Sequence, residues 1–218
     1  MRVRADGVGT RKRILQSAGE VFADRGYRAA TVAEICRRAR ANSAAINYHF
    51  KGKASLYAAV WRHFAEEAVR LYPLHGGVAP DAPPEARFRG LLISLLRRMS
   101  DRGKLGTFHR LRMMEMANPT GLIDGVRWQV LKPLRDQTRQ LLQELLGSEP
   151  DTRMLDFCEM TVIGPCLMAQ LTLKHRCSPG TPVFRQTDIE AFADHCVRFA
   201  VAGLNALRVS GPQGDGSH

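Results

Sequence analysis

Apolar residues recur at helical spacing along nearly the whole chain, and this pattern constrains the fold more than any other feature. Ile14, Ala18, Val21 and Phe22, for example, fall at positions i, i+4, i+7 and i+8, so they share one face of a helix. No segment of the sequence alternates apolar and polar residues over the length of a β-strand. The chain is therefore predicted to be all-α.

Capping residues, prolines and glycines indicate where the helices begin and end. Thr31-Val32-Ala33-Glu34 matches a capping box, in which a hydroxyl and a carboxylate each satisfy a free amide at a helix start. Gly26 is placed to end the first helix, and Gly164-Pro165 is placed to kink a later one. The predicted helices span residues 11–25, 32–39, 43–48, 53–71, 85–100, 104–117, 122–146, 151–174 and 188–207.

Length and composition exclude several classes of protein. With 218 residues, 44% of them hydrophobic, the chain can bury the core of one or two domains. Its longest apolar stretch, Thr161 to Leu173, falls short of the roughly 20 residues that a membrane span needs. No apolar segment follows the basic N-terminus, so no signal peptide is expected. The five scattered cysteines lack a C-x-x-C pair, which predicts a cytoplasmic protein without a disulfide framework, metal or cofactor.

Positive charge is concentrated at one end of the chain. The net charge is +11, and residues 1–72 contribute +8 of it, from 14 basic and 6 acidic side chains. A protein that was basic merely for solubility would spread this charge more evenly. The asymmetry therefore favours a polyanion-binding module joined to a near-neutral body, although a solvated basic arm is the alternative.

The same basic end contains the pattern of a helix-turn-helix. Three short helices are predicted within about forty residues, with a tight connection at residues 39–42 between the second and the third. The third helix is the one that such a motif places in the major groove. Its side chains suit contacts with bases and phosphates, and flanking residues suit contacts with phosphates. The predicted DNA contacts are Arg28, Thr31, Arg40, Asn42, Ser43, Ala45, Asn47, Tyr48, His49 and Lys53.

Two segments of this region resemble the TetR-type repressors. Thr31-Val32-Ala33-Glu34-Ile35 matches a T-x-x-x-I run, and the segment from Ala45 to Tyr57 is similar to a Y-x-H-F-x-x-K-x-x-L pattern. The resemblance covers about residues 10–57. It implies an all-helical fold of about nine helices, with a phosphate contact at Lys53. The implied domains are a DNA-binding domain at residues 1–57 and a helical ligand-binding and dimerisation domain at 58–208. The Gly- and Ser-rich composition of the C-terminal end predicts a disordered tail at 209–218.

The string Ala45-Ile46-Asn47-Tyr48-His49-Phe50 further resembles the YbiH/CerR-like subgroup, as do residues 112–120, 132–133 and 164–167. The sequence departs from the family pattern at three places. Arg40 replaces the usual glycine at the motif's corner, which implies a strained residue or a wider turn. Asn47 replaces the usual tyrosine, so a phosphate contact is lost or passes to Tyr48. Pro165 replaces the subgroup's glutamine, which puts the ligand chemistry in doubt.

Candidate effector contacts lie farther along the chain. Methionines adapt to varied apolar ligands, and polar side chains among apolar neighbours could fix a ligand's orientation. Ordinary core packing and salt bridges are the alternative explanation. His49 likewise has two possible roles, as a phosphate contact or as a packed residue that orients the end of its helix. The candidates for the effector site are His109, Arg112, Met113, Glu115, Met116 and Met168.

These observations predict a ligand-responsive transcriptional repressor that binds a palindromic operator on double-stranded DNA. A homodimer is expected through the last two helices, because Ile189, Phe192, Cys196 and Phe199 begin an apolar stripe along the final one. A small-molecule effector, which the sequence does not identify, would move the fourth helix and break the spacing of the two recognition helices. A small helical enzyme is one alternative, although no G-x-S-x-G, P-loop or H-E-x-x-H motif is present. A non-specific architectural DNA-binding protein is the other.

Overall fold

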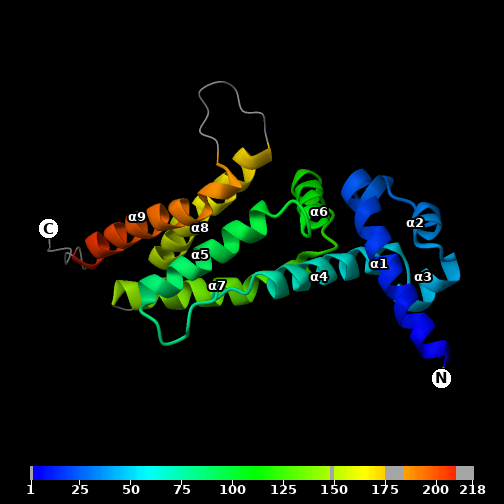
Figure 1. The fold of residues 1–218 in the computed structure, drawn as a ribbon, viewed down its shortest axis with the longest axis horizontal. Helices are drawn as coiled ribbons and strands as arrows, with labels where there is room; N and C mark the ends of the chain where they lie inside the picture. Colours follow the sequence, from blue (N-terminus) through cyan, green and yellow to red (C-terminus); the bar gives the residue numbers. More distant parts are fainter. Residues whose placement is uncertain (1, 148–149, 175–183, 210–218) are drawn as a thin grey trace, which may run out of the picture. The chain divides into compact units, whose positions relative to one another are not determined.

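The structure is a computed structural model that describes residues 2–147, 150–174 and 184–209. Within these ranges the chain forms α-helices and one 3-10 turn, Gln186–Asp188, and no strand (Figure 1). The prediction of an all-α fold is therefore confirmed. The helices are α1 (Arg2–Ala29), α2 (Val32–Ala39), α3 (Ser43–Phe50), α4 (Lys53–Leu71), α5 (Pro84–Ser100), α6 (Gly106–Ala117), α7 (Asp124–Leu146), α8 (Thr152–Lys174) and α9 (Ile189–Val209).

Most helix ends lie within two residues of the predicted positions, and the clearest exception is the start of α1. This helix begins at Arg2, whereas the sequence predicted a start after Thr10. Its regular part ends where predicted, because Gly26 adopts φ 71° and ψ 171°. Helix α9 extends to Val209, two residues beyond its predicted end. The predicted tail from residue 210 on and the loop predicted at 178–182 lie outside the described residues.

Thr31 caps α2 as the sequence predicted. Its hydroxyl accepts a hydrogen bond from the Glu34 amide at 3.2 Å. The Glu34 carboxylate, expected to complete the capping box, instead pairs with Arg25 and Arg38, each at 3.0 Å. Its ion pairs therefore join α2 to the end of α1 and to the next turn of α2 itself.

The chain divides into two compact units whose borders differ from those of the predicted domains. Unit 1 contains residues 1–71 and 101–131, and unit 2 contains residues 72–100 and 132–218. Helices α1 to α4, α6 and the start of α7 thus belong to unit 1. Unit 2 holds α5, the rest of α7, α8 and α9. The assignment of DNA binding to residues 1–57 and of ligand binding to residues 58–208 stays a prediction.

Unit 1 is built around α1, which packs against α2, α4 and α6. Close packing of α1 on α4 requires a glycine, because a Cβ at Gly19 would lie 2.3 Å from the Phe64 ring. A buried hydrogen bond joins α4 to α6, donated by the Tyr57 hydroxyl to Glu115 Oε2 at 2.7 Å. The other carboxylate oxygen, Oε1, accepts from the amide and the hydroxyl of Thr120, each at 2.9 Å. Helix α6 is therefore an integral part of the unit that holds the helix-turn-helix.

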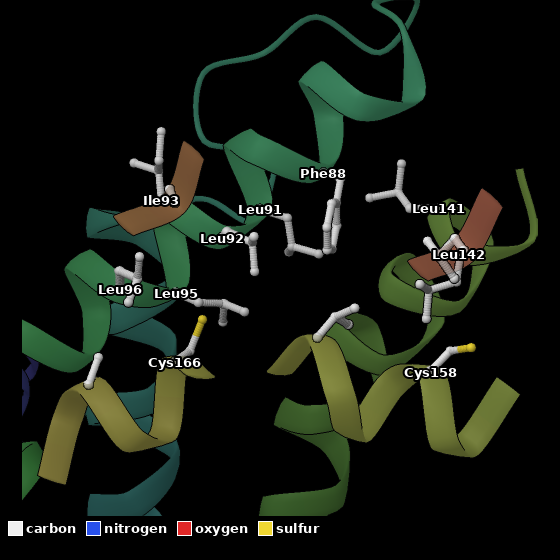
Figure 2. Packing of buried hydrophobic residues seen from close by; sticks show 14 of the residues in the cluster. Phe88, Leu91, Leu92, Ile93, Leu95, Leu96, Leu141, Leu142, Cys158 and Cys166 are labelled. Atoms are coloured by element: carbon white, nitrogen blue, oxygen red, sulfur yellow. The ribbon is translucent and has the colours of Figure 1, made fainter. Parts of the chain in front are cut away.

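Unit 2 has a mostly aliphatic core, as the low aromatic content of the chain requires. Helix α5 packs against α8 and α9 and supplies a dense row of leucines (Figure 2). Cys166, which has no exposed surface, lies in this core, and burial raises the pKa of its thiol to about 12. The labelled core residues of Figure 2 are Phe88, Leu91, Leu92, Ile93, Leu95, Leu96, Leu141, Leu142, Cys158 and Cys166.

Candidate DNA-binding site

A tight turn joins α2 to α3, and Arg40 lies at its corner. Arg40 adopts a left-handed conformation with φ 48° and ψ 51°, and its amide bonds to carbonyls at the end of α2. This conformation costs about 1–2 kcal/mol for a residue other than glycine. The sequence left open whether Arg40 is strained or the turn is wider, and the structure shows a strained Arg40 in a tight turn. The Arg40 side chain is exposed, so the turn carries a positive charge where a glycine would carry none.

Asn42 starts α3. Its backbone is extended, with φ −109° and ψ 168°, and its Oδ1 accepts a hydrogen bond from the Ala45 amide at 2.9 Å. This is the geometry of an N-cap, which satisfies one of the free amides of the first turn. The structural role of Asn42 is thus defined, whereas its contact with DNA stays a prediction.

Helix α3 has one buried face and one polar, exposed face. Ile46 and Phe50 point inward, with 0% and 5% of their surfaces exposed. Tyr48 is 84% exposed, and Ser43 and Asn47 are exposed as well. The outer face of this eight-residue helix therefore presents a hydroxyl, a carboxamide and a phenol, which can donate to and accept from base edges.

The remaining candidates on α3 are less open to solvent. His49 is half-buried, and its ring lies 4.9 Å from the Tyr48 ring and 6.1 Å from the Phe50 ring, measured between centroids. It is therefore placed to hold the orientation of Tyr48 at the end of α3, which is compatible with the structural alternative for this residue. Ala45 is half-buried one turn earlier, where its small side chain allows close approach of another surface.

Lys53, at the start of α4, is tied to the end of α1. Its ammonium lies 4.6 Å from the centroid of the Tyr27 ring and donates to the Arg28 carbonyl at 3.3 Å. Sequence reasoning missed Tyr27, because a cation–π contact between residues far apart in the chain leaves no local pattern. The phosphate contact expected of Lys53 stays a prediction, and its described contacts join α1 to α4.

The flanking basic residues differ in how far their charge is neutralised. Arg38 pairs with Glu34 at 3.0 Å and with Asp24 at 3.6 Å. Arg28, Arg37 and Arg40 are exposed on the surface of unit 1. Arg28 follows Tyr27 at the end of α1, Arg37 lies on α2 and Arg40 lies at the turn before α3, so each helix of this region carries or adjoins an exposed arginine.

The candidate effector residues do not all lie in one unit. His109, Arg112, Met113, Glu115 and Met116 belong to α6 in unit 1, whereas Met168 belongs to α8 in unit 2. His109 and Glu115 are buried, and the three hydrogen bonds of the Glu115 carboxylate go to Tyr57 and Thr120. Burial lowers the pKa of Arg112. Met116 and Met168 are exposed by 63% and 58%.

Hollows are found among the described residues of unit 2, and two of them are considered. The larger, of about 310 Å³, lies between the segment before α5 and α7, and its lining includes His75, Val78, Arg87 and Gln140. The smaller, of about 240 Å³, lies between the start of α5 and the end of α9. Neither is lined by any of the predicted effector residues, so an effector site at those residues stays a prediction. None of the helices in the described part of the chain combines the length and the apolar composition that a membrane span requires.

Two family profiles match the sequence. The profile described as "Bacterial regulatory proteins, tetR family" matches residues 14–60, which include α2 and α3. The profile described as "HTH-type transcriptional dual regulator CecR, C-terminal domain" matches residues 84–204, more than half of the chain. The two profiles together extend from α1 into α9.

Individual relatives agree with the profiles. The HTH-type transcriptional dual regulator CecR of Shigella flexneri is 30% identical over 167 residues, which cover 68% of this chain and 70% of that protein. A tetR-family regulatory protein from Rhodococcus RHA1 superposes with a TM-score of 0.63 at 16% identity, covering 89% of this chain and 96% of that one. The TetR-family regulator PfmR of Thermus thermophilus superposes with a TM-score of 0.61 at 16% identity, covering 85% and 97%. At these identities the two structures support the fold alone.

Proposed function

Because the chain belongs to the TetR family of bacterial transcriptional regulators, we propose that it represses transcription by binding a palindromic operator as a homodimer. The observation that carries the proposal is the exposed polar face of α3, flanked by exposed arginines, on a helix whose other face is buried. Such a surface suits the major groove, where each base pair presents its own pattern of donors and acceptors. Neither the helical-enzyme nor the architectural alternative accounts for family profiles of regulators over both parts of the chain.

The dimer is proposed to form through α8 and α9. On α8, Phe157, Met160, Leu167 and Met168 fall at i, i+3, i+10 and i+11 and are 54%, 72%, 42% and 58% exposed. Large apolar side chains that recur along one helical face and remain open to solvent mark an interaction surface. Gly164 lies between them, and nothing stands within 4 Å of the Cβ that it lacks, so a second helix can approach closely there.

The final helix, α9, contributes a shorter apolar surface. Phe199 is 70% exposed and Leu207 is 40% exposed, with Gly203 between them. The predicted stripe along α9 is only partly available for a dimer, because Ile189 is buried in the core of unit 2 and Phe192 and Cys196 pack against that core. A second copy of the chain, related by a two-fold axis, would cover the exposed remainder of the stripe. The two copies of α3 would then read two half-sites about 34–36 Å apart.

Release from DNA is proposed to follow binding of a small-molecule effector in the cytoplasm. Helix α6 packs against α1 and, through Glu115, is bonded to Tyr57 of α4. A ligand that favours a different position of α6 would therefore shift the helices that support α3, and the population able to span both half-sites would fall. His109, Arg112, Met113, Glu115 and Met116, all on α6, are the proposed effector contacts, whereas Met168 is proposed for the dimer surface of α8 instead.

Repression, as opposed to activation, requires a test of its own. The relative from Shigella flexneri is described as a dual regulator, and FasR of Mycolicibacterium smegmatis, 41% identical over 59 residues, is described as an activator. Transcription in vitro from the natural promoter, with and without the protein, distinguishes the possibilities. Repression predicts fewer transcripts as protein is added. An increase would show activation instead.

Selection of DNA fragments from a random pool tests the operator. The selected site should be a two-fold symmetric sequence, bound at fixed salt at least about 10³-fold more tightly than random DNA. The Asn47→Ala variant should relax the preference at particular positions by about 1–3 kcal/mol, and Ser43→Ala should have the smaller effect. Equal affinity for selected and random DNA would refute specific regulation and favour the architectural alternative.

Sedimentation tests the dimer. The Phe199→Glu protein should be monomeric at micromolar concentration and should lose operator binding, because a charge would be buried at the interface. Gln143→Glu, which adds the same charge at an exposed position of α7, should remain dimeric. A monomeric wild type that still binds the operator tightly would contradict the proposal.

A further inference from the structure

Arg112 lies on the inner face of α6, among buried side chains. Phe108, four residues before it, and Glu115, three residues after it, share its face of the helix and are buried. The Arg112 side chain is itself half-buried. Burial lowers the pKa of its guanidinium, because the charged form loses contact with water. A cation is therefore held where water solvates it poorly.

This cation has no counter-ion in the described part of the chain. Its guanidinium takes part in neither an ion pair nor a hydrogen bond there. Glu115 is the acidic residue of α6, but its carboxylate accepts from the Tyr57 hydroxyl and from the amide and hydroxyl of Thr120. The carboxylate that could neutralise Arg112 from the same helix is therefore engaged elsewhere.

Two other half-buried arginines have acidic partners. Arg135 of α7 pairs with Asp156 at 2.9 Å and with Glu159 at 3.2 Å, and Arg139 pairs with the same two carboxylates. A buried charge without such a partner destabilises a fold, and a well-packed apolar side chain in its place is often neutral or stabilising. Packing alone therefore does not explain an arginine at position 112.

The surroundings of Arg112 indicate the chemistry that would complete it. A planar guanidinium binds a carboxylate through two parallel hydrogen bonds, which are stronger than those to a neutral acceptor. Met113 and Met116, on the same helix, offer unbranched apolar side chains to the rest of such a molecule, and Met116 is exposed. The half-buried position of Arg112 favours a small molecule over a protein or a nucleic acid.

We propose that Arg112 binds the carboxylate of a small organic anion with an apolar body, and that this anion is the effector. The inference rests on the proposed function and gives the effector its chemical class. Binding would neutralise the charge of Arg112, so an arrangement of α6 that admits the anion would become more populated. Because α6 packs against α1, the change would reach the helices that support α3.

Stability without ligand tests whether Arg112 serves a ligand or the fold. The Arg112→Met protein should have a urea midpoint equal to that of wild type or higher, because it no longer buries an unpaired charge. Arg110→Met removes the same charge from the exposed side of α6 and is the matched control, which should shift the midpoint little. A lower midpoint for Arg112→Met than for Arg110→Met would show that Arg112 stabilises the fold, and would overturn the proposal.

Binding of simple carboxylates tests the chemical class. Butyrate, octanoate and benzoate are compared, at constant ionic strength, with the neutral amides butyramide, octanamide and benzamide. Trp61 reports on α6, because its ring centroid lies 5.5 Å from that of Phe108, and the Trp128→Phe background makes it the single tryptophan. At least one carboxylate should change this fluorescence at lower concentration than its amide and should release the operator.

Variants of Arg112 connect that response to the guanidinium. Arg112→Met should weaken binding of the carboxylate about tenfold or more, and Arg112→Lys should weaken it less, because lysine keeps the charge without the planar fork. Arg110→Met should bind the carboxylate as wild type does. Equal binding by wild type and Arg112→Met, no preference for any carboxylate over its amide, or binding without release of the operator would each overturn the proposal.

Operator selection, measured without any carboxylate, keeps the two proposals apart. A wild type that selects its operator but fails the carboxylate titration refutes the anionic effector alone. A wild type without operator preference refutes the proposed function.

Discussion

Removing one hydroxyl from α4 should measurably destabilise the unit that holds α3. The Tyr57 side chain is 1% exposed, and its hydroxyl donates to a carboxylate of Glu115 that is itself only 6% exposed as a residue. In the Tyr57→Phe protein the ring fills the same space, but Glu115 Oε2 loses this donor. The Thr120 amide and hydroxyl continue to donate to Oε1. A buried carboxylate is thereby left with one oxygen poorly solvated.

The expected cost follows from the charge of the acceptor. A hydrogen bond to a charged group contributes about 1.5–3 kcal/mol, and leaving a buried acceptor without its donor costs a similar amount. The 2.7 Å distance and the near-complete burial of both partners indicate the middle of that range. We therefore expect Tyr57→Phe to lower the free energy of unfolding of unit 1 by about 2 kcal/mol.

Urea unfolding measures this loss, and the positions of the tryptophans make the measurement specific. The chain has two tryptophans, Trp61 on α4 and Trp128 on α7, and both lie within unit 1. Their fluorescence therefore reports on unit 1, whereas circular dichroism reports on the helices of both units. Tyr48→Phe removes an exposed hydroxyl and should leave the unfolding midpoint unchanged.

A double-mutant cycle with Glu115→Gln isolates the bond itself. If the bond accounts for the loss, the Tyr57→Phe change should cost at least about 1 kcal/mol less in the Glu115→Gln background. A loss below about 0.5 kcal/mol from Tyr57→Phe alone would refute the reasoning, since that is the range of ordinary surface substitutions.

The same pair predicts a pH dependence. Burial, followed by the hydrogen bond to Glu115, raises the pKa of Tyr57 above its usual value. In the unfolded chain a tyrosine ionises near pH ~10, so the unfolded state gains stability above that pH while folded Tyr57 stays protonated. The stability that Tyr57 contributes is therefore complete below pH ~10 and declines above it. The difference between wild type and Tyr57→Phe should shrink above this pH, and a constant difference up to pH ~11 would contradict the assignment.

Three further predictions concern single residues. Arg40→Gly should raise the free energy of unfolding by up to about 1 kcal/mol by removing left-handed strain, yet weaken DNA binding and reduce its salt dependence; a destabilised variant would contradict the strain argument. Asn42→Ala removes the α3 cap and should lower the free energy of unfolding in urea by about 0.5–2 kcal/mol, whereas Asn42→Asp keeps an acceptor and should lower it much less. Equal losses in the two variants would exclude capping as the cause. Cys166, fully buried and with its pKa raised to about 12, should resist alkylation by iodoacetamide at pH ~8 in the folded protein, as followed by mass spectrometry; labelling as fast as that of half-buried Cys36 would show that the core of unit 2 opens readily.

The parts of the fold that could be predicted from the sequence depend on interactions within a few residues. The spacing of Ile46 and Phe50 predicted which face of α3 is buried, and that face has the burial expected. Thr31 caps α2 because its hydroxyl reaches an amide three residues ahead, a contact that the local sequence specifies. The left-handed corner at Arg40 was one of two alternatives left open, and the structure distinguishes between them.

What the sequence could not predict depends on contacts between distant residues. Nothing in the local pattern indicates that Glu115 bonds to Tyr57, 58 residues earlier, and this contact is part of what joins α6 to unit 1. The candidate effector residues were chosen by side-chain type, which does not reveal that Met168 lies in the other unit. The early start of α1 was missed because Gly7 and Gly9 lower helix propensity by about 1 kcal/mol each relative to alanine.

The discontinuity of unit 1 has a consequence for its biosynthesis. Its two stretches, residues 1–71 and 101–131, leave the ribosome at different times. At about 5–20 residues per second, roughly 2–9 s pass between synthesis of residue 71 and of residue 117, where α6 ends. Throughout that interval the nascent helix-turn-helix lacks α6, and aromatic side chains such as Trp61 and Phe64, which pack against Phe108 of α6, have no cover from it. The same discontinuity affects recombination between related genes that exchanges DNA-binding specificity. Both stretches of unit 1 would have to be transferred together. Otherwise α1 and α4 of one protein would have to pack against α6 of another, with which they had not evolved.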